Sequence, residues 1–280
     1  MHVEAARGDD GRVVVPTRDV GLGTAYERRA VYRLIARWCG RPAPATALEG
    51  PIDGMAGIPG LHLLGLAGLG TRVTVAVADA TAAEAVREVY ERAGLGERLE
   101  VVVDDEPPQR RFELVVTFNA LPLVRDWRAY LREQVARAPR HAIVVVTNRG
   151  SYGALIRRGL RFARRQESGR ELFDHESTDP RLLRQALSGL GRVHDETYVD
   201  CPWWPDLFVP VGTTLWRAAV GASAPAPDAG LTYDARSFPH AREPLPRELR
   251  DALARHPSLE DRGRYLGRLF GHQRAWLVER

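Results

Sequence analysis

The fold is indicated most directly by the stretch Phe112-Glu113-Leu114-Val115-Val116-Thr117-Phe118-Asn119. Its apolar, β-branched run predicts a strand that is buried on both faces and ends in a polar side chain. Two comparable stretches precede it. Residues 72–79 form a predicted strand that ends in an acid, and residues 47–60 form a short strand that enters a glycine-rich turn and then a helix. Together the three stretches predict a parallel α/β sheet.

Further predicted elements lie on both sides of this stretch. Helices are predicted at 24–39, 82–94, 124–137 and 152–165, and strands at 99–103 and 141–147. Strands and helices alternate roughly every 25–30 residues, which favours right-handed crossovers between parallel strands. A helix at 180–190 is followed by two strands at 192–199 and 213–220. No helix fits between these two strands, so we expect an antiparallel hairpin at the sheet edge.

The chain divides into three predicted parts. Residues 1–23 form a flexible N-terminal segment, and residues 24–221 form the main domain. Residues 222–280 form a C-terminal linker and helical extension, in which a proline- and alanine-rich stretch, 222–246, precedes two short helices at about 246–255 and 258–270. A chain of this length can bury one large core with an appendage.

Composition indicates a globular protein with a mildly basic surface. The hydrophobic fraction is 44%, the charged fraction is 27%, and the formal net charge is +4. All 40 cationic side chains are arginines, and most of them are interleaved with acids along the chain. We therefore favour a solvated surface over a nucleic-acid groove and regard nucleic acid as an unlikely partner.

Cysteine content and hydropathy indicate the cellular compartment and the absence of a metal site. Cys39 and Cys201 are the two cysteines, and no CxxC pair is present, so we expect no metal site. No apolar run of signal or membrane-spanning length occurs. A thiol-poor chain of this kind fits the cytoplasm, and we expect no contact with a membrane.

Over roughly residues 24–220 this arrangement resembles the class I S-adenosylmethionine-dependent methyltransferases. The most specific resemblance is the 112–119 strand with its polar last residue, followed by Trp127 and a helix. Residues 141–148 resemble the next strand of that family, which often ends in a short polar turn. The resemblance implies a three-layer Rossmann-like α/β fold. Its sheet has seven mostly parallel strands and is closed by an antiparallel pair, with an N-terminal helix and a C-terminal helical extension. It also implies S-adenosylmethionine as the cofactor.

The resemblance assigns cofactor contacts to the ends of the strands. Glu49 would hold the amino end of the cofactor through the turn, and Asp79 would accept the ribose hydroxyls unless it only caps the next helix. Asp104 or Asp105 would contact the adenine amine, and the residues alone do not choose between these two acids. The remaining implied contacts are the turn residues Gly50, Asp53, Gly54 and Gly57, and Phe118 and Asn119 under the transferable methyl group.

The glycine-rich turn departs from the pattern of the family. The family shows an acid followed by alternating glycines, whereas Pro51 and Asp53 stand here where glycines are expected. Glycines allow the backbone to approach the cofactor closely, and proline removes one N–H donor. The turn is therefore either a reshaped cofactor site or a relic that binds nothing.

Few residues are candidates for catalysis or for contacts with the methyl acceptor. His62 and Asn119 are the candidate catalytic residues, since no histidine or carboxylate follows Asn119 closely. No Asn-Pro-Pro-aromatic motif is present, because Ala120 and Leu121 follow Asn119. Candidate substrate contacts are Tyr26, Arg149, Tyr152, Trp203 and Trp204.

Three functions remain open from the sequence. The leading prediction is a methyltransferase that acts on a small-molecule acceptor. The first alternative is a catalytically silent protein of the same fold that binds a partner, and the second is an RNA methyltransferase, which only the arginine content supports. The acceptor is not identified, and a homo-oligomer is left open.

Overall fold

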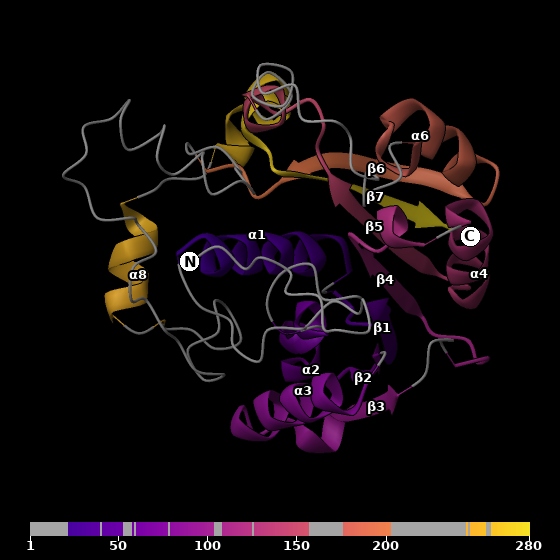
Figure 1. The fold of residues 1–280 in the computed structure, drawn as a ribbon. Coiled ribbons are helices and arrows are strands. Elements are labelled where there is room, and N and C mark those ends of the chain that lie inside the picture. Colours follow the sequence, from indigo (N-terminus) through magenta and orange to yellow (C-terminus); the bar gives the residue numbers. More distant parts are fainter. Residues whose placement is uncertain are drawn as a thin grey trace, which may run out of the picture.

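The computed structural model describes residues 22–39, 41–52, 58, 60–77, 79–103, 108–124, 126–156, 176–202, 245, 247–255 and 259–280. Seven strands form one sheet in the order β3-β2-β1-β4-β5-β7-β6 (Figure 1). They are β1 (Thr46–Ile52), β2 (Arg72–Val77), β3 (Leu99–Val103), β4 (Leu114–Phe118), β5 (His141–Thr147), β6 (Arg192–Val199) and β7 (Gln273–Glu279). The first five strands pair in parallel, and β7 is antiparallel to both β5 and β6.

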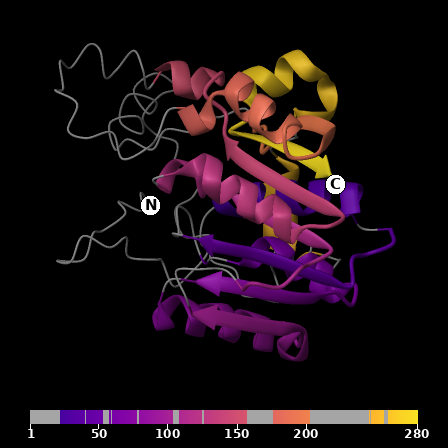
Figure 2. The same cartoon turned by 90° about the vertical axis from the view of Figure 1, so that its right-hand side faces the viewer.

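Helices cover both faces of the sheet, which gives the predicted three-layer fold (Figures 1 and 2). One face packs against α1 (Leu22–Cys39), α2 (Leu64–Gly68) and α3 (Ala80–Arg92), and the other packs against α4 (Trp127–Arg137) and α6 (Pro180–Ser188). The short 3₁₀ helices are η1 (Leu61–Leu63), η2 (Gly96–Arg98), η3 (Leu121–Leu123), η4 (Glu176–Thr178) and η6 (Glu260–Arg262). The prediction of a Rossmann-like α/β fold with an N-terminal helix is confirmed.

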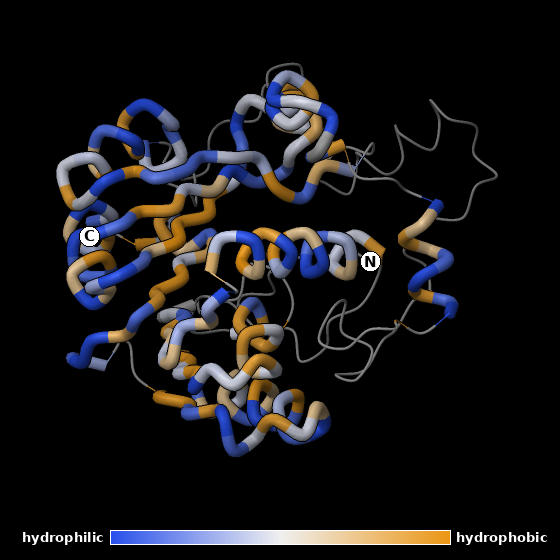
Figure 3. The backbone as a smooth tube through the Cα atoms, turned by 180° about the vertical axis from the view of Figure 1, so that it is seen from behind, coloured by the Kyte–Doolittle hydropathy of each residue, from blue (hydrophilic) through white to orange (hydrophobic). Residues whose placement is uncertain are grey.

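Burial explains the sequence pattern of the strands. All five residues of β4 are buried, as the continuous apolar run predicts for a strand covered on both faces. By contrast, β6 lies at the sheet edge, and only its last residue, Val199, is buried. Figure 3 shows this contrast, because the hydrophobic colour is concentrated in the central strands.

The strand that pairs with β6 lies elsewhere in the chain than we predicted. Val199 of β6 and Thr147 of β5 both pair with Gln273, so the last strand of the chain lies between β5 and β6. The prediction of a closing hairpin with 213–220 is therefore wrong in its second strand, and residues 213–220 lie outside the described residues. The boundary at 221 needs the same correction, since β7 belongs to the sheet. Pairing between strands that are far apart in the chain is not encoded in the sequence of either strand alone.

The two predicted tail helices are present as α8 (Arg247–Ala254) and α9 (Arg264–Phe270). Leu249 and Leu253 of α8 form a small core with Leu22 and Tyr26 of α1. Along α9, a Cβ placed on Gly267 would lie 3.2 Å from the Tyr198 side chain, so a small residue lets α9 approach β6 closely. No helix in the described part of the chain is both long and apolar enough to cross a bilayer.

Replacement of Trp276 tests whether the last strand is part of the core. Trp276 of β7 is fully buried, so Trp276→Ala should lower the free energy of unfolding by about 3–5 kcal/mol in urea denaturation. Tyr265→Ala is the control, because Tyr265 is 91% exposed, and its effect should stay within about 0.5 kcal/mol. Equal losses in the two variants would contradict a central position for β7.

Candidate functional site

The carboxyl ends of β1, β2 and β4 meet at one edge of the sheet. Glu49 of β1 pairs in register with Val75 of β2 and Val116 of β4, so the residues that follow these positions gather at this edge. In open α/β sheets, ligands bind outside the carboxyl ends of the strands, where the strand order reverses. The sheet order places that reversal between β1 and β4.

Two glycines fix the backbone near the end of β1 and at the start of η1. Gly50 has φ 119°, and a Cβ placed on it would lie 2.3 Å from the carbonyl oxygen of Ala76. Gly60 has φ 74°, and its Cβ would lie 2.3 Å from Cγ1 of Val75. Both positions therefore require glycine. Gly60 was not among the predicted site residues, while Asp53, Gly54 and Gly57 lie outside the described residues.

A buried polar network joins the strand, the turn and the N-terminal helix. The Arg28 guanidinium of α1 donates to Nε2 of His62 at 2.7 Å and to the carbonyl oxygen of Ile58 at 2.8 Å. Nδ1 of His62 contacts Oε1 of Glu49 in a short hydrogen bond. Since a guanidinium can only donate, Nε2 accepts and Nδ1 carries the proton toward the carboxylate. Neutral His62 thus bridges a buried cation and a buried anion.

This network makes His62 a structural residue in the described chain. Its side chain is 4% exposed, both ring nitrogens are engaged, and its ring stacks on Phe118 with centroids 4.0 Å apart. A general base needs a nitrogen that can reach the acceptor. The geometry therefore favours His62 as a residue that positions Glu49 and Phe118, and Arg28 is a site residue that the sequence analysis missed.

Glu49 keeps one carboxylate oxygen without a partner. The residue is fully buried, and Oε2 has no hydrogen-bond partner among the described residues, although Oε1 is bound by His62. A buried carboxylate oxygen left unpaired is costly. This oxygen is therefore a candidate acceptor for a donor that is not part of the described chain.

Two buried tyrosines hold the backbone next to this network. The Tyr32 hydroxyl donates to the carbonyl oxygen of Leu61, and the Tyr90 hydroxyl donates to that of Gly60 at 3.2 Å. Burial raises the pKa of the Tyr90 phenol well above its ordinary value, and the negative charge of Glu49 raises it further. Tyr90 therefore remains a hydrogen-bond donor across the physiological range.

The predicted residues at the ends of β2 and β4 have defined positions. Asp79 caps α3, since Oδ1 accepts from the Ala82 amide at 2.8 Å, and its side chain is half-buried. Asn119 is 4% exposed and has φ 51°, a left-handed conformation that asparagine tolerates better than most residues. Its Oδ1 accepts from the Thr147 hydroxyl at 3.4 Å. Asp104 and Asp105 lie outside the described residues.

The three candidate substrate residues that the structure describes have different surroundings. Tyr26 is buried between α1 and α8 and donates to the carbonyl oxygen of Cys201 at 3.4 Å. Tyr152 packs edge-on against Phe270 with ring centroids 5.1 Å apart. Arg149 lines a pocket of about 560 Å³ beside the ends of β5 and β6. Trp203 and Trp204 lie outside the described residues.

No group of three or more metal-ligating side chains occurs in the part of the chain that the structure describes.

A second polar cluster lies where β6 ends. Nδ1 of His272 lies 2.9 Å from Oδ2 of Asp200, and Glu260 accepts from the Cys201 amide at 3.3 Å. Burial first, and the charge of Asp200 second, raise the pKa of the Glu260 carboxyl to about 7. Backbone hydrogen bonds from Asp200 and Cys201, and then the positive charge of Arg33, lower this pKa.

Comparison with known proteins identifies the fold. No protein-family profile matches the sequence, and no curated protein matches it either. The structure is similar to magnesium protoporphyrin IX methyltransferase from Synechocystis PCC 6803 with bound S-adenosylhomocysteine, at 14% identity and a TM-score of 0.51, over 64% of this chain and 78% of that one. The chain therefore has the fold of the class I S-adenosylmethionine-dependent methyltransferases.

A second comparison extends over more of the chain with a lower score. It is with an S-adenosylmethionine-dependent methyltransferase from Thermotoga maritima, described as a possible histamine N-methyltransferase. Identity is 10% and the TM-score is 0.49, over 92% of this chain and 91% of that one.

Two substitutions of His62 test the buried network. His62→Phe leaves Arg28 and Glu49 buried without their bridge and should lower the free energy of unfolding by about 3–5 kcal/mol. His62→Gln can still donate to Glu49 and accept from Arg28, so its cost should be about 1–2 kcal/mol. Urea denaturation measures both values. A glutamine variant as unstable as the phenylalanine variant would contradict the bridging role.

The buried Glu260 carboxyl predicts a pH dependence of stability. Because its folded pKa is raised to about 7 from an ordinary value of 4.5, the folded state binds more protons between these pH values. The free energy of unfolding should therefore fall by about 1–3 kcal/mol as pH rises from 4.5 to 7. Glu260→Gln should reduce this slope while keeping an acceptor for the Cys201 amide. An unchanged slope in that variant would remove Glu260 as its source.

Proposed function

We propose that the chain is an S-adenosylmethionine-dependent methyltransferase that acts on a small-molecule acceptor. The observation that carries this proposal is the paired geometry of Gly50 and Glu49 at the end of β1. Gly50 turns the backbone with a positive φ, and Glu49 beside it keeps a buried carboxylate oxygen without a partner among the described residues. A site of this kind suits close backbone approach by a ligand that carries a hydrogen-bond donor.

The residues at the edge of the sheet fit the parts of this cofactor. Glu49 would stabilise the ammonium group of the methionine portion, and Asp79 would accept hydrogen bonds from the ribose diol. The cap of α3 uses Oδ1 of Asp79, which leaves the second oxygen of this carboxylate for the ribose. Asp104 or Asp105 is proposed for adenine. When bound, the cofactor supplies an activated methyl group.

The chain contributes mainly binding and alignment to the transfer. Asn119 and Phe118 end β4 in fixed positions, and Asp126, the next acid along the chain, caps α4 by accepting from the Ala129 amide at 2.9 Å. Alignment of the reacting atoms alone lowers the barrier substantially. We therefore favour an acceptor atom that has a free lone pair or ionises near neutral pH, since it needs little help from a general base.

A catalytically silent protein is the second candidate, and one observation favours it. Oε1 of Glu49 is already bound by His62, and Pro51 near the end of β1 stands where the family has glycine. If the turn closes over Glu49, the same fold would serve to bind a protein partner. Cofactor binding separates the two candidates.

Calorimetry with S-adenosylhomocysteine tests the proposal. We expect binding by the full chain, and Asp79→Ser should weaken the affinity about tenfold or more, because serine keeps the helix cap but loses the carboxylate. Asp126→Ser is the matched control, since Asp126 caps α4 through the same type of hydrogen bond, and its affinity should stay within about twofold.

Two results would count against this proposal. Absence of heat at millimolar ligand would support the silent alternative. Equal affinity of the Asp79 and Asp126 variants would remove Asp79 from the binding site.

A further inference from the structure

We infer that the pocket beside the ends of β5 and β6 binds an oxyanion group, a phosphate or a carboxylate, of the acceptor. That the anionic group belongs to a methyl acceptor depends on the proposed function, whereas anion binding itself depends only on the pocket. The pocket has a volume of about 560 Å³, and no aspartate or glutamate occurs among its described lining residues. Its guanidinium groups come from Arg149, Arg181, Arg184, Arg264, Arg268 and Arg274.

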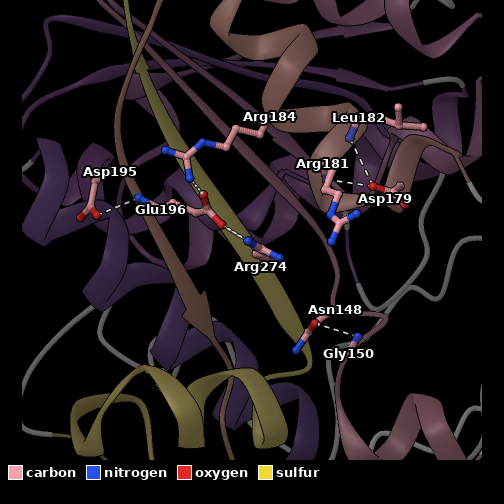
Figure 4. A network of polar contacts seen from close by, with 9 residues as sticks. All are labelled: Asn148, Gly150, Asp179, Arg181, Leu182, Arg184, Asp195, Glu196 and Arg274. Atoms are coloured by element: carbon pink, nitrogen blue, oxygen red, sulfur yellow. Dashed lines mark hydrogen bonds and ion pairs between the residues drawn. The ribbon is translucent and has the colours of Figure 1, made fainter.

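Glu196, a carboxylate beside the pocket, compensates part of this charge. Glu196 accepts from Arg184 at 2.9 Å and from Nε of Arg274 at 2.7 Å, and Figure 4 shows the two guanidiniums reaching it from α6 and β7. The Glu196 side chain is 7% exposed, so it is committed to these two partners. Two cations that share one anion leave a net positive charge, to which Arg181, Arg264 and Arg268 add.

Arg268 is held at the pocket by the backbone around it. The Asn148 side chain donates to the carbonyl oxygens of Arg268 and Gly271 at 2.9 and 2.8 Å, which fixes the end of α9 against the turn after β5. Its Oδ1 accepts from the Gly150 amide at 3.0 Å (Figure 4). A Cβ on Gly150 would lie 3.7 Å from Nε of Arg268, an ordinary contact distance, so Gly150 lies directly beside this side chain.

The first turn of α6 is also fixed by hydrogen bonds between a side chain and the backbone. Asp179 accepts from the amides of Arg181 and Leu182 at 2.8 and 3.2 Å, which caps the helix (Figure 4). Arg181 and Arg184 are three residues apart, so they project from neighbouring positions on one helix surface. Segments that are far apart in the chain thus deliver guanidiniums to one hollow.

The pocket lies next to the end of β4, where the methyl group would be presented. Thr147, which lines the pocket, donates to Oδ1 of Asn119. An anion held by the arginines would therefore anchor one end of an acceptor whose other end reaches Asn119. Guanidiniums bind phosphate and carboxylate oxygens in bidentate fashion, which suits this anchoring role.

The simpler alternative is that these arginines only face solvent. Arginines on other helices show how such side chains are arranged. Arg92 on α3 pairs with Glu88, and Arg247 on α8 pairs with Asp251, each one helical turn away and exposed. At the pocket the arginines converge on a hollow instead, and mutual repulsion there is relieved by a bound anion. The concave shape favours a small anion over a long nucleic-acid strand, which needs an extended basic groove.

Calorimetry with simple anions tests this inference on the full chain. Inorganic phosphate, pyrophosphate and acetate are titrated separately at constant ionic strength, and the arm with the highest affinity distinguishes a phosphate site from a carboxylate site. The double variant Arg181→Gln/Arg268→Gln should weaken that affinity about tenfold or more. The control Arg87→Gln/Arg132→Gln removes the same charge from exposed positions on α3 and α4 and should change it less than about twofold.

The affinity for S-adenosylhomocysteine is measured for the same proteins. The inference is supported if the Arg181→Gln/Arg268→Gln variant loses anion binding but keeps its affinity for S-adenosylhomocysteine. Anion binding by a chain that does not bind S-adenosylhomocysteine would sink the proposed function but keep the anion site. The inference would be overturned if the chain binds no anion, or if both double variants lose affinity equally. It would also be overturned if single-stranded RNA binds more tightly than the simple anions, with a steep salt dependence.

Discussion

The structure depends on the buried bridge from Arg28 through His62 to Glu49. Two charged side chains are tolerated in the core here because a neutral imidazole accepts from Arg28 and donates to one carboxylate oxygen of Glu49. The bridge fixes α1, the turn before η1 and β1 relative to one another. Since His62 also stacks on Phe118, the end of β4 is tied to the same unit. The proposed cofactor edge is therefore held by one polar network rather than by separate local contacts.

The end of the chain completes the other half of the sheet. With β7 between β5 and β6, the helix before it, α9, lies against β6 and brings Arg264 and Arg268 to the arginine pocket. Arg274 reaches the same pocket from β7 itself. The contact of Thr147 with Asn119 connects this pocket with the proposed cofactor edge. The fold thus places a proposed methyl donor and a proposed anion anchor on adjacent strands.

Local patterns in the sequence predicted most elements, and non-local contacts were missed. The buried runs of β2, β4 and β5 and the capped helices follow from short-range periodicity and turn residues. The last strand was misplaced because pairing across many residues leaves no local signal. Arg28 was missed for a similar reason, since an arginine on a helix normally faces solvent. His62 was predicted as a catalytic candidate, but only its spatial neighbours reveal its bridging position. For Asp79 the sequence allowed both a cap and a ribose contact, and the structure shows the cap.

The central claim is that the edge formed by β1, β2 and β4 holds the cofactor. A crystal structure of the full chain grown with S-adenosylhomocysteine tests it most directly. We predict electron density for the homocysteine portion beside Gly50 and Glu49, with the ribose hydroxyls within hydrogen-bond distance of Asp79. Density that shows the turn after β1 folded into this edge, with the ligand absent or bound elsewhere, would contradict the claim.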